Sequence, residues 1–371
     1  MPLAAILSSR QSKTPRGSDD WVRGTLAAVR YAVSRNWTVV SSMALNTWEL
    51  VTWAAGAARA SLILIIPRLS PQEDPAARDA LLADFALDTH QVEWRFFDAP
   101  ASPMSTKSWW TARDRIVVEL ADIVLPVSVR PGGNLSQLIR EATASKRIES
   151  QFAAPFRQVS HQVHYALGSD LTNIAIRDWK DDFITHWTRA SIGPWPGETR
   201  AQFYSDLVSV RDRYCRCALD TLHRILREKR IRASAWRIGG SAPMVAFTRL
   251  SPIASIPLIR WRPRWTRWSF EPYGIAVHKD FAATRHVGPV RYVTDAEWRA
   301  LAADEKPLCH RRGRAADVWP AEQEWRHYGD FLLGDAPAEA FHVIVHHADE
   351  IPLTQPLTPA PVASLVGRQH A

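Results

Sequence analysis

The chain has 371 residues and a mass of 41.8 kDa, more than one hydrophobic core usually organises, so two domains are expected. With 46% hydrophobic and 23% charged residues and no run near about 18 consecutive apolar residues, the sequence predicts a globular protein with neither a membrane span nor a secretion signal. Three cysteines are too few for a disulfide framework, and we expect a cytoplasmic protein with reduced thiols.

The positive charge of the chain is concentrated in its second half. Lys and Arg number 46 against 38 Asp and Glu, a net charge of +8. Between Arg211 and Trp268 we count 14 Lys and Arg against 3 Asp and Glu, a local charge of +11, so the rest of the chain is slightly acidic. A basic surface is therefore expected there. The 17 tryptophans can fill a core, anchor an interface or stack on bases, so their number favours no single function.

The first 130 residues alternate between β-type and helical patterns. β-type runs lie at 3–7, 38–42, 61–67, 92–97 and 122–129, with apolar residues at helical spacing over 21–34 and near 75–86 and 108–120. A further helix is expected to start at Asn46, which with Glu49 matches a capping box. This repeated order predicts an α/β fold, a Rossmann-like parallel sheet with helices on both faces.

Three loops are expected at one edge of this sheet, where the carboxyl ends of parallel strands meet and ligands bind. Small residues let the backbone approach an anion, helix N-termini direct N–H groups at it, and basic side chains add charge. A Gly-Gly pair is also common in plain turns, so it is the convergence of three loops that favours an anion site. The residues expected to bind the ligand are Ser9, Arg10, Lys13, Ser41, Ser42, Arg130, Gly132, Gly133 and Asn134.

Four segments carry a family resemblance. They read SSRQSKTP at 8–15, TVVSSMALNTWEL at 38–50, SLILIIP at 61–67 and VRPGGN at 129–134. Their order resembles the SLOG superfamily, which groups the DprA/Smf DNA-processing proteins with the LOG, or lysine-decarboxylase-like, nucleotide phosphoribohydrolases. The resemblance covers residues 1–150 and implies a Rossmann-like nucleotide-binding domain.

The chain departs from the LOG pattern at one decisive position. LOG enzymes carry PGGxGTxxE, whose glutamate serves hydrolysis of the N-glycosidic bond, whereas here the register reads PGGNLSQLI and Ile139 replaces the glutamate. An isoleucine neither donates nor accepts a proton. Glu141 lies two residues on, about 200° around a helix, so we expect it to face elsewhere. The departure disfavours phosphoribohydrolase chemistry and favours a domain that binds a nucleotide or a nucleotide-derived signal.

The middle of the chain is expected to be a mostly helical connector, over residues 151–235. Apolar positions between Phe203 and Leu226 recur every three or four residues, which predicts one long amphipathic helix over 200–230 with a basic end. The stretch 178–198 is rich in polar residues and tryptophan, and its role stays open.

The last third is expected to hold a separate α+β domain over 236–351, because short β-type segments are grouped there with little helix. Residues 352–371 are expected to form a Pro-rich, flexible tail.

A basic and aromatic run, RWRPRWTRW, lies at the start of this domain. Alternation along a strand puts Arg260, Arg262 and Arg264 on one face and Trp261 and Trp265 on the other. Arginine neutralises phosphate and tryptophan stacks on bases, so the three arginines are candidate nucleic-acid contacts. The same alternation also describes a half-buried edge strand with a solvated cationic face.

A second resemblance covers residues 236–350. The segments EPYGIAVHKDFAATRHVGPVRYV and WPAEQEWRHYGDFLL are similar to uncharacterised domains encoded with abortive-infection and other phage-defence genes. ADP-ribosyltransferases use an Arg, then a Ser or Thr, then a Glu of an ExE pair, and Arg237, Thr248, Glu322 and Glu324 occur in that order. These four are the candidate catalytic residues, and an ion pair of Glu324 with Arg326 is the plain alternative.

The sequence therefore favours two alternative functions. The first is a two-module protein of prokaryotic anti-phage defence, in which a Rossmann-like sensor of a nucleotide, NAD or an ADP-ribose derivative is coupled to an effector. The second is a nucleic-acid-directed protein, either DprA-like in binding single-stranded DNA or an enzyme that modifies a DNA base. The sequence predicts no metal, leaves homo-oligomer formation open and does not identify the ligand.

Overall fold

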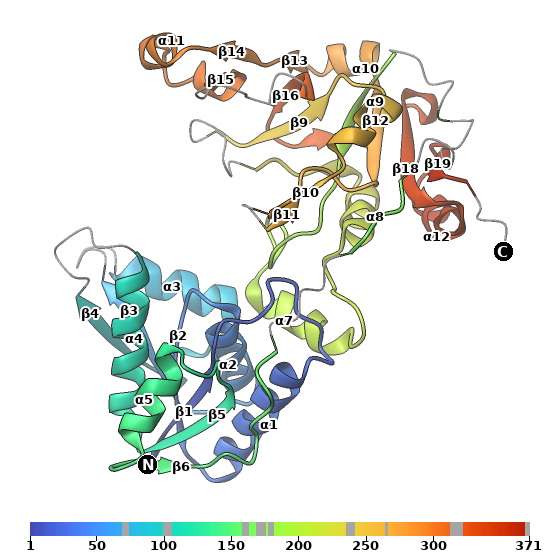
Figure 1. Cartoon of the computed structure of the whole chain (residues 1–371). Coiled ribbons are helices and arrows are strands. Elements are labelled where there is room, and N and C mark those ends of the chain that lie inside the picture. The colour runs from blue at the N-terminus through green and yellow to red at the C-terminus, as the bar shows by residue number, and fades with distance from the viewer. Residues whose placement is uncertain are drawn as a thin grey trace. The chain divides into compact units, whose positions relative to one another are not determined.

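The computed structural model describes residues 1–68, 74–98, 106–157, 163–167, 176, 182–234, 242–263, 266–311 and 322–367 (Figure 1). The chain forms two compact units. Unit 1 consists of Met1–Gln162 and Ile192–Cys215, and unit 2 of Val163–Ser191 and Arg216–Ala371.

Unit 1 is a six-stranded parallel sheet with the strand order β4-β3-β2-β1-β5-β6. The chain builds outward from β1 to β4 and then returns to place β5 on the other side of β1, so the order reverses between β1 and β5. The expected Rossmann-like α/β architecture is confirmed. Its elements are β1 (Leu3–Ser8), α1 (Asp20–Ser34), β2 (Thr38–Ser42), α2 (Asn46–Ala57), β3 (Leu62–Arg68), α3 (Asp74–Phe85), η1 (Thr89–Gln91), β4 (Val92–Asp98), α4 (Thr106–Leu120), β5 (Ile123–Ser128), α5 (Asn134–Ala142), β6 (Arg147–Ile148) and α7 (Arg200–Ser209).

Both faces of this sheet are buried, which explains why its strands read as continuous apolar runs. One face packs against α1 and α2 through residues such as Ala28 and Val51. The other packs against α4 and α5, through Val117 and Leu138, and Figure 1 shows these two helices side by side. Helix α7 belongs to unit 1 because Phe203 and Tyr204, among others, pack in a further cluster with α1, α2 and α3.

Unit 2 is built on a seven-stranded sheet with the order β13-β16-β9-β7-β12-β18-β19. All pairs are antiparallel except β18 with β19. One face packs on α8, and the other carries a smaller cluster that includes Trp187 and Ile344. The strands of unit 2 are β7 (Phe183–Trp187), β8 (Arg230–Ile231), β9 (Met244–Thr248), β10 (Trp261–Arg262), β11 (Arg267–Trp268), β12 (Gly274–His278), β13 (Gly288–Pro289), β14 (Arg291–Val293), β15 (Cys309–Arg311), β16 (Glu324–Tyr328), β17 (Phe331–Leu332), β18 (Phe341–His347) and β19 (Val362–Val366). Its helices are α8 (Ala218–Glu228), α9 (Pro252–Ser255), η3 (Ile256–Leu258), α10 (Lys279–Thr284), α11 (Asp295–Ala300), η5 (Lys306–Leu308), η7 (Ala338–Ala340), η8 (Ala348–Glu350), α12 (Ile351–Thr354) and η9 (Gln355–Leu357).

The structure corrects the expected connector over 151–235. Strand β7, inside that range, is an inner strand of the unit 2 sheet, whereas α7 packs in unit 1. The predicted helix over 200–230 is two helices, α7 and α8, separated by residues 210–217. The periodic pattern continues across the break because Tyr214 contributes to the core of one unit and Leu222 to the core of the other.

Two further expectations are corrected. Residues 352–371 are not simply a tail, because β19 pairs with β18 and Leu365 is buried. Asn46 and Glu49 do not form a capping box. Asn46 instead donates to the carbonyl of Ser12, and Glu49 accepts from the hydroxyl of Tyr204, a partner far away in sequence.

No helix within the described ranges is long and apolar enough to cross a membrane.

Candidate functional site

The reversal of strand order between β1 and β5 is where open parallel sheets bind ligands, beyond the carboxyl ends of the strands. The loop from Ser9 to Asp19 follows β1, and the loop from Val129 to Gly133 follows β5. These two predicted loops are joined by hydrogen bonds. Ser9 donates its backbone N–H to the carbonyl of Ser128 at 2.8 Å, and Arg130 donates its N–H to Ser9 Oγ at 2.9 Å.

The glycine pair adopts a tight turn before α5. Gly132 has a φ of +68°, which L side chains rarely adopt, and a Cβ there would meet nothing within 4 Å. Gly133 is the N-cap of α5, and a Cβ on it would lie 3.2 Å from the carbonyl oxygen of Arg130. Among the described residues, no side-chain cap bond is made at this end of α5. The first N–H groups of a helix lack intrahelical partners and attract anions. The turn places those of α5 at the reversal of strand order between β1 and β5, which is the switch point of the sheet.

The loops that follow β1 and β5 carry basic side chains. Arg10, Lys13 and Arg130 are all exposed, as is Asn134 at the first position of α5. Asn134 donates to Asp114 Oδ2 at 3.2 Å, which links α5 to α4. The predicted residues of the first and third loops are therefore brought to one edge of the sheet, and these two loops carry three exposed cations.

Ser41 and Ser42, unlike the exposed residues of the first and third loops, lie inside the sheet. Both are fully buried at the end of β2. Ser41 Oγ donates to the carbonyl of Trp48 and accepts from Thr52, and Ser42 Oγ donates to the carbonyl of Ile65 at 2.5 Å. Their hydroxyls hold β2 to its neighbours.

An arginine that sequence reasoning missed lies beneath the loops. Arg113, on α4, is 1% exposed and donates to the carbonyl of Met43 at 2.7 Å and to Asp114 Oδ1. Its guanidinium carbon lies 5.2 Å from the Trp48 ring centroid and 4.9 Å from that of Trp110. Burial lowers the pKa of Arg113, and the nearby Arg10 lowers it further, while Asp114 opposes the shift. The signal in the sequence was the adjacent Arg-Asp pair on an otherwise amphipathic helix.

Asp114 brings a carboxylate to this edge of the sheet. Burial raises its pKa, and the bonds from Arg113 and Asn134 oppose that shift. The edge therefore combines exposed cations with one partly buried acid.

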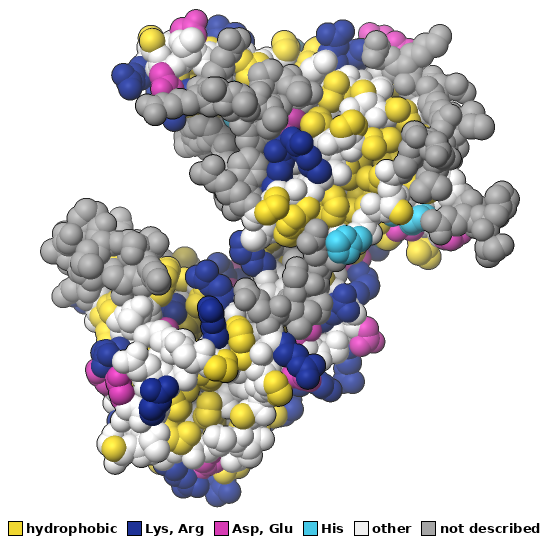
Figure 2. Space-filling model, viewed as in Figure 1, with side chains coloured by type: hydrophobic (Ala, Val, Ile, Leu, Met, Phe, Trp, Pro, Cys, Tyr) yellow, Lys and Arg dark blue, Asp and Glu magenta, His cyan; other side chains and the backbone are white. Residues whose placement is uncertain are grey.

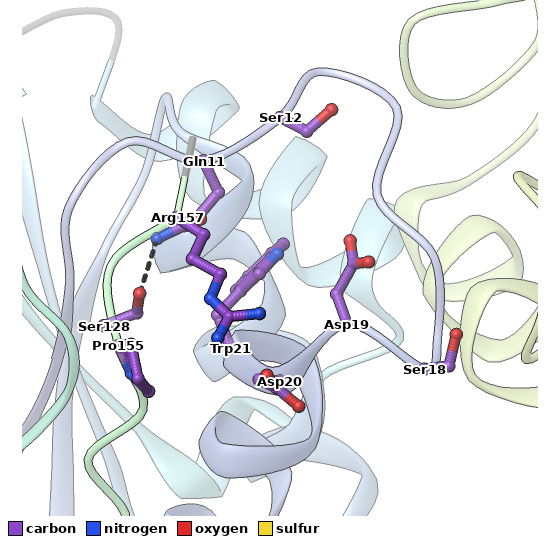
Figure 3. Close-up of a pocket in the computed structure, with 9 residues that line it drawn as sticks. All are labelled: Gln11, Ser12, Ser18, Asp19, Asp20, Trp21, Ser128, Pro155 and Arg157. Atoms are coloured by element: carbon purple, nitrogen blue, oxygen red, sulfur yellow. Dashed lines mark hydrogen bonds between the residues drawn. The ribbon is translucent and has the colours of Figure 1, made fainter. Parts of the chain in front are cut away.

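A cavity of about 180 Å³ adjoins the β1–β5 edge on the α1 side (Figure 3). Gln11 donates to Ser128 Oγ at 3.0 Å at one side of it. In Figure 3 the side chains of Asp19 and Arg157 both lie at the cavity, so charges of both signs line it. The lining residues are Gln11, Ser12, Ser18, Asp19, Asp20, Trp21, Ser128, Pro155 and Arg157.

The expected difference between Ile139 and Glu141 is confirmed. Ile139 is partly buried against the core under α5. Glu141 is exposed, accepts from Gln137 at 2.9 Å and lies 3.6 Å from Arg115. No carboxylate thus stands at the position that the LOG pattern requires.

In unit 2 three of the four candidate catalytic residues lie together, and Arg237 falls outside the described residues. Thr248 on β9 is paired in register with Glu324 on β16, and its hydroxyl donates to the carbonyl of Glu322 at 2.5 Å. Glu324 accepts two bonds from Arg326, at 2.8 and 3.1 Å.

The candidate nucleic-acid residues differ from one another, and Arg264 lies outside the described residues. Arg260 is exposed. Arg262, on β10, donates to Ser269 Oγ at 2.6 Å, and its NH2 lies 4.0 Å from Glu322 Oε1, with 18% of its side chain exposed. Trp261 packs edge to face against Trp268.

Taken together, unit 1 is a Rossmann-like α/β unit whose loops meet at the switch point of its sheet. Nine solved chains match this chain over part of its length. The three described next are 10–17% identical to it. DNA processing protein A from Helicobacter pylori, whose structure describes a single-stranded DNA binding mode, is 17% identical, with 40% of this chain and 63% of that chain covered and a TM-score of 0.28. DNA processing protein A (DprA) from Streptococcus pneumoniae is 14% identical, with 40% and 49% covered and a TM-score of 0.30. The molybdenum cofactor carrier protein from Chlamydomonas reinhardtii is 10% identical, with 40% and 89% covered and a TM-score of 0.25.

No protein-family model matches the chain, and no curated protein matches it.

Proposed function

We propose that unit 1 binds a nucleotide or a nucleotide derivative through its phosphate at the β1–β5 switch point. The observation that carries the proposal is the bond from the Arg130 N–H to Ser9 Oγ, because it fixes the glycine turn against the β1 loop. The turn leads into the N-terminus of α5, and Arg10 and Arg130 are exposed on the two joined loops. The adjoining cavity, with Gln11 and Asp19, can take the hydrogen-bonding groups of a sugar or base.

A thermal-shift screen tests this proposal. Nucleotides, cyclic dinucleotides, NAD and ADP-ribose are added to the full chain, and at least one is expected to raise the melting temperature in a saturable way. The Gly133→Val variant should lose the shift, since its side chain is pressed against the carbonyl of Arg130. The matched control is Gly288→Ala, where an added Cβ meets nothing within 4 Å. No shift with any of these ligands would contradict the proposal.

We further propose that unit 2 is the effector of a prokaryotic anti-phage defence protein. The support is the sequence resemblance over residues 236–350, together with the adjacency of Thr248, Glu322 and Glu324. An ADP-ribosyltransferase-like reaction is one effector chemistry compatible with that grouping. The test is plating efficiency of phages on bacteria that carry the gene, in which protection should fall with Gly133→Val and with Glu322→Ala.

Binding of single-stranded nucleic acid is the second candidate function. It is favoured by the local charge of +11 between Arg211 and Trp268 and by the exposure of Arg260. Such binding should weaken steeply with salt, and removal of Arg260 should reduce the slope. Tight binding of oligothymidylate without any small-molecule shift would replace the first proposal with this one.

A further inference from the structure

The loop before β16 holds Glu322, whose carboxylate accepts no hydrogen bond from the described residues. Glu322 has 13% of its side chain exposed, and its nearest described cation is Arg262, at 4.0 Å. No described residue donates a hydrogen bond to its carboxylate, whereas Glu324 accepts two from Arg326. Gln323, between the two glutamates, has a φ of +44°. Such backbone costs about 1–3 kcal/mol for a non-glycine residue and often occurs at functional sites.

Positive charge faces Glu322 from several elements. Arg260 and Arg262 lie at β10, and Arg189 follows β7. Arg189 and Arg262 both donate to Ser269, through its carbonyl and its hydroxyl respectively. Figure 2 shows Lys and Arg side chains gathered beside hydrophobic ones on the drawn face of unit 2.

The remaining charged and titratable groups around Glu322 are few. Glu324 and Arg326 neutralise one another on β16, and Tyr292 lies close by on β14. The described surroundings of Glu322 therefore hold more positive charge than negative.

Three buried donors of unit 2, on β7 and β11, have no acceptor among the described residues. Thr185 is paired in register with Thr248, is 1% exposed, and its hydroxyl has no partner among the described residues. The indole N–H groups of Trp187 and Trp268 are likewise buried with no acceptor in the described part of the chain. Buried donors without acceptors are costly, and the Thr185 hydroxyl lies beside Thr248, which bonds the Glu322 carbonyl, so a ligand with acceptor oxygens at this site would satisfy it.

We propose that unit 2 carries its own site for a small phosphorylated molecule, in which Arg189, Arg260 and Arg262 supply the positive charge and the Glu322 carboxyl supplies a hydrogen-bonding group. A small molecule fits better than a nucleic-acid strand, because the Arg262 side chain is turned inward to Ser269 and Glu322. This site is separate from the one proposed for unit 1.

Proton linkage follows from the chemistry of the site. Burial and the neighbouring Glu324 raise the pKa of Glu322 to about 7. Below that pH the carboxyl is neutral and can donate to a phosphate oxygen, and above it the carboxylate repels the anion. Ligand affinity should therefore fall about tenfold for each pH unit above 7.

The test uses the full chain in a Gly133→Val background, which separates this site from unit 1. ADP-ribose is the probe, because its pyrophosphate lacks the ionisation near pH 6 of a phosphate monoester. Its dissociation constant is measured by calorimetry between pH 6 and pH 8.5. We expect the constant to rise about tenfold per unit above pH 7, to stay near its low-pH value in Glu322→Gln, and to increase at least tenfold in Arg262→Gln.

The control is Arg285→Gln, an arginine of unit 2 that pairs with Asp335 instead, and it should bind like the parent. Arg262→Gln and Arg285→Gln are first shown to unfold at the parent temperature within a few degrees. An unchanged pH slope in Glu322→Gln, equal binding by Arg262→Gln, or binding of oligothymidylate but not of ADP-ribose would overturn the proposal.

Discussion

Ser9 and Arg130, 121 positions apart in the sequence, are joined by a hydrogen bond from the Arg130 N–H to the Ser9 hydroxyl at 2.9 Å. The bond connects the two loops that flank the reversal of strand order in unit 1. It also sets the glycine turn that leads into α5. If the proposed phosphate site lies there, loop geometry and ligand affinity must depend on this pair together.

Replacing Ser9 by alanine should weaken ligand binding more than it weakens folding. Loss of one hydrogen bond costs about 1 kcal/mol, so the dissociation constant of a ligand found in the thermal screen should rise roughly fivefold. The melting temperature without ligand should move by only a few degrees. Calorimetry on Ser34→Ala, which removes an exposed hydroxyl bonded within α1, provides the control. Equal affinity of Ser9→Ala and the parent would remove Ser9 from the site.

The ion pair between Arg113 and Asp114 should be essential to the stability of unit 1. Replacement by methionine leaves the Asp114 carboxylate, 14% exposed, without its main counter-charge, and we expect a loss of about 3 kcal/mol. The double change Arg113→Met with Asp114→Asn should recover much of that loss. Urea unfolding of both variants measures the difference. Equal destabilisation by the single and the double change would mean that packing against the tryptophans, and not charge pairing, is the main contribution.

Tyr204 should hold α7 on unit 1. It is 1% exposed, and its hydroxyl donates to Glu49 Oε2 at 3.0 Å, while Arg200 on the same helix pairs with Glu49 and Asp84. Tyr204→Phe should therefore lower the free energy of unfolding by about 1–2 kcal/mol. A double-mutant cycle with Glu49→Gln isolates the pair, and additive losses would contradict the contact.

Glu322 should make unit 2 less stable as the pH rises. Its folded pKa is about 7 and its unfolded value is near the ordinary 4.5, so between these values the folded chain binds more protons and stability falls with rising pH. Glu322→Gln should therefore raise the free energy of unfolding by roughly 3 kcal/mol at pH 8 and by little at pH 4.5. Thermal unfolding at both pH values measures this, and an equal effect at the two would rule out the titration.

His346 should make unit 2 less stable as the pH falls, which is the opposite of the effect of Glu322. Burial, with the charge of His347, lowers its pKa to about 4, so the folded chain binds fewer protons than the unfolded chain between about 4 and 6.5. Stability contributed by neutral His346 is present above 6.5 and is lost as the pH falls through that window. In His346→Phe this loss should disappear. The same variant at pH 8 serves as the reference for any packing cost, and an unchanged acid profile would contradict the assignment.

The end of the chain offers a direct test of the unit 2 sheet. Deleting residues 359–371 removes β19, exposes the edge of β18 and strips Leu365 from its cluster, so the product should misfold or aggregate. A deletion of only 368–371 retains β19 and is the control. Normal solubility and melting of the longer deletion would restore the interpretation of this region as a dispensable tail.

The sequence by itself determined the architecture of unit 1. Strands buried on both faces are uniformly apolar and helices have one apolar stripe, so the alternation and the three loops at one edge could be read from local patterns. Local patterns also predicted the place of the glycine turn and the exposed cations Arg10 and Arg130. The replacement of the glutamate by Ile139 is visible in the sequence itself.

Only the tertiary structure decided which segments share a core. The periodic pattern over 200–230 is the same whether its apolar residues enter one core or two, so the break between α7 and α8 had no local signal. Ser41 resembles a loop ligand in sequence, yet its hydroxyl bonds internally because β2 is an inner strand. The inward turn of Arg262 towards Glu322, 60 positions later, likewise depends on long-range pairing, which local propensity does not encode.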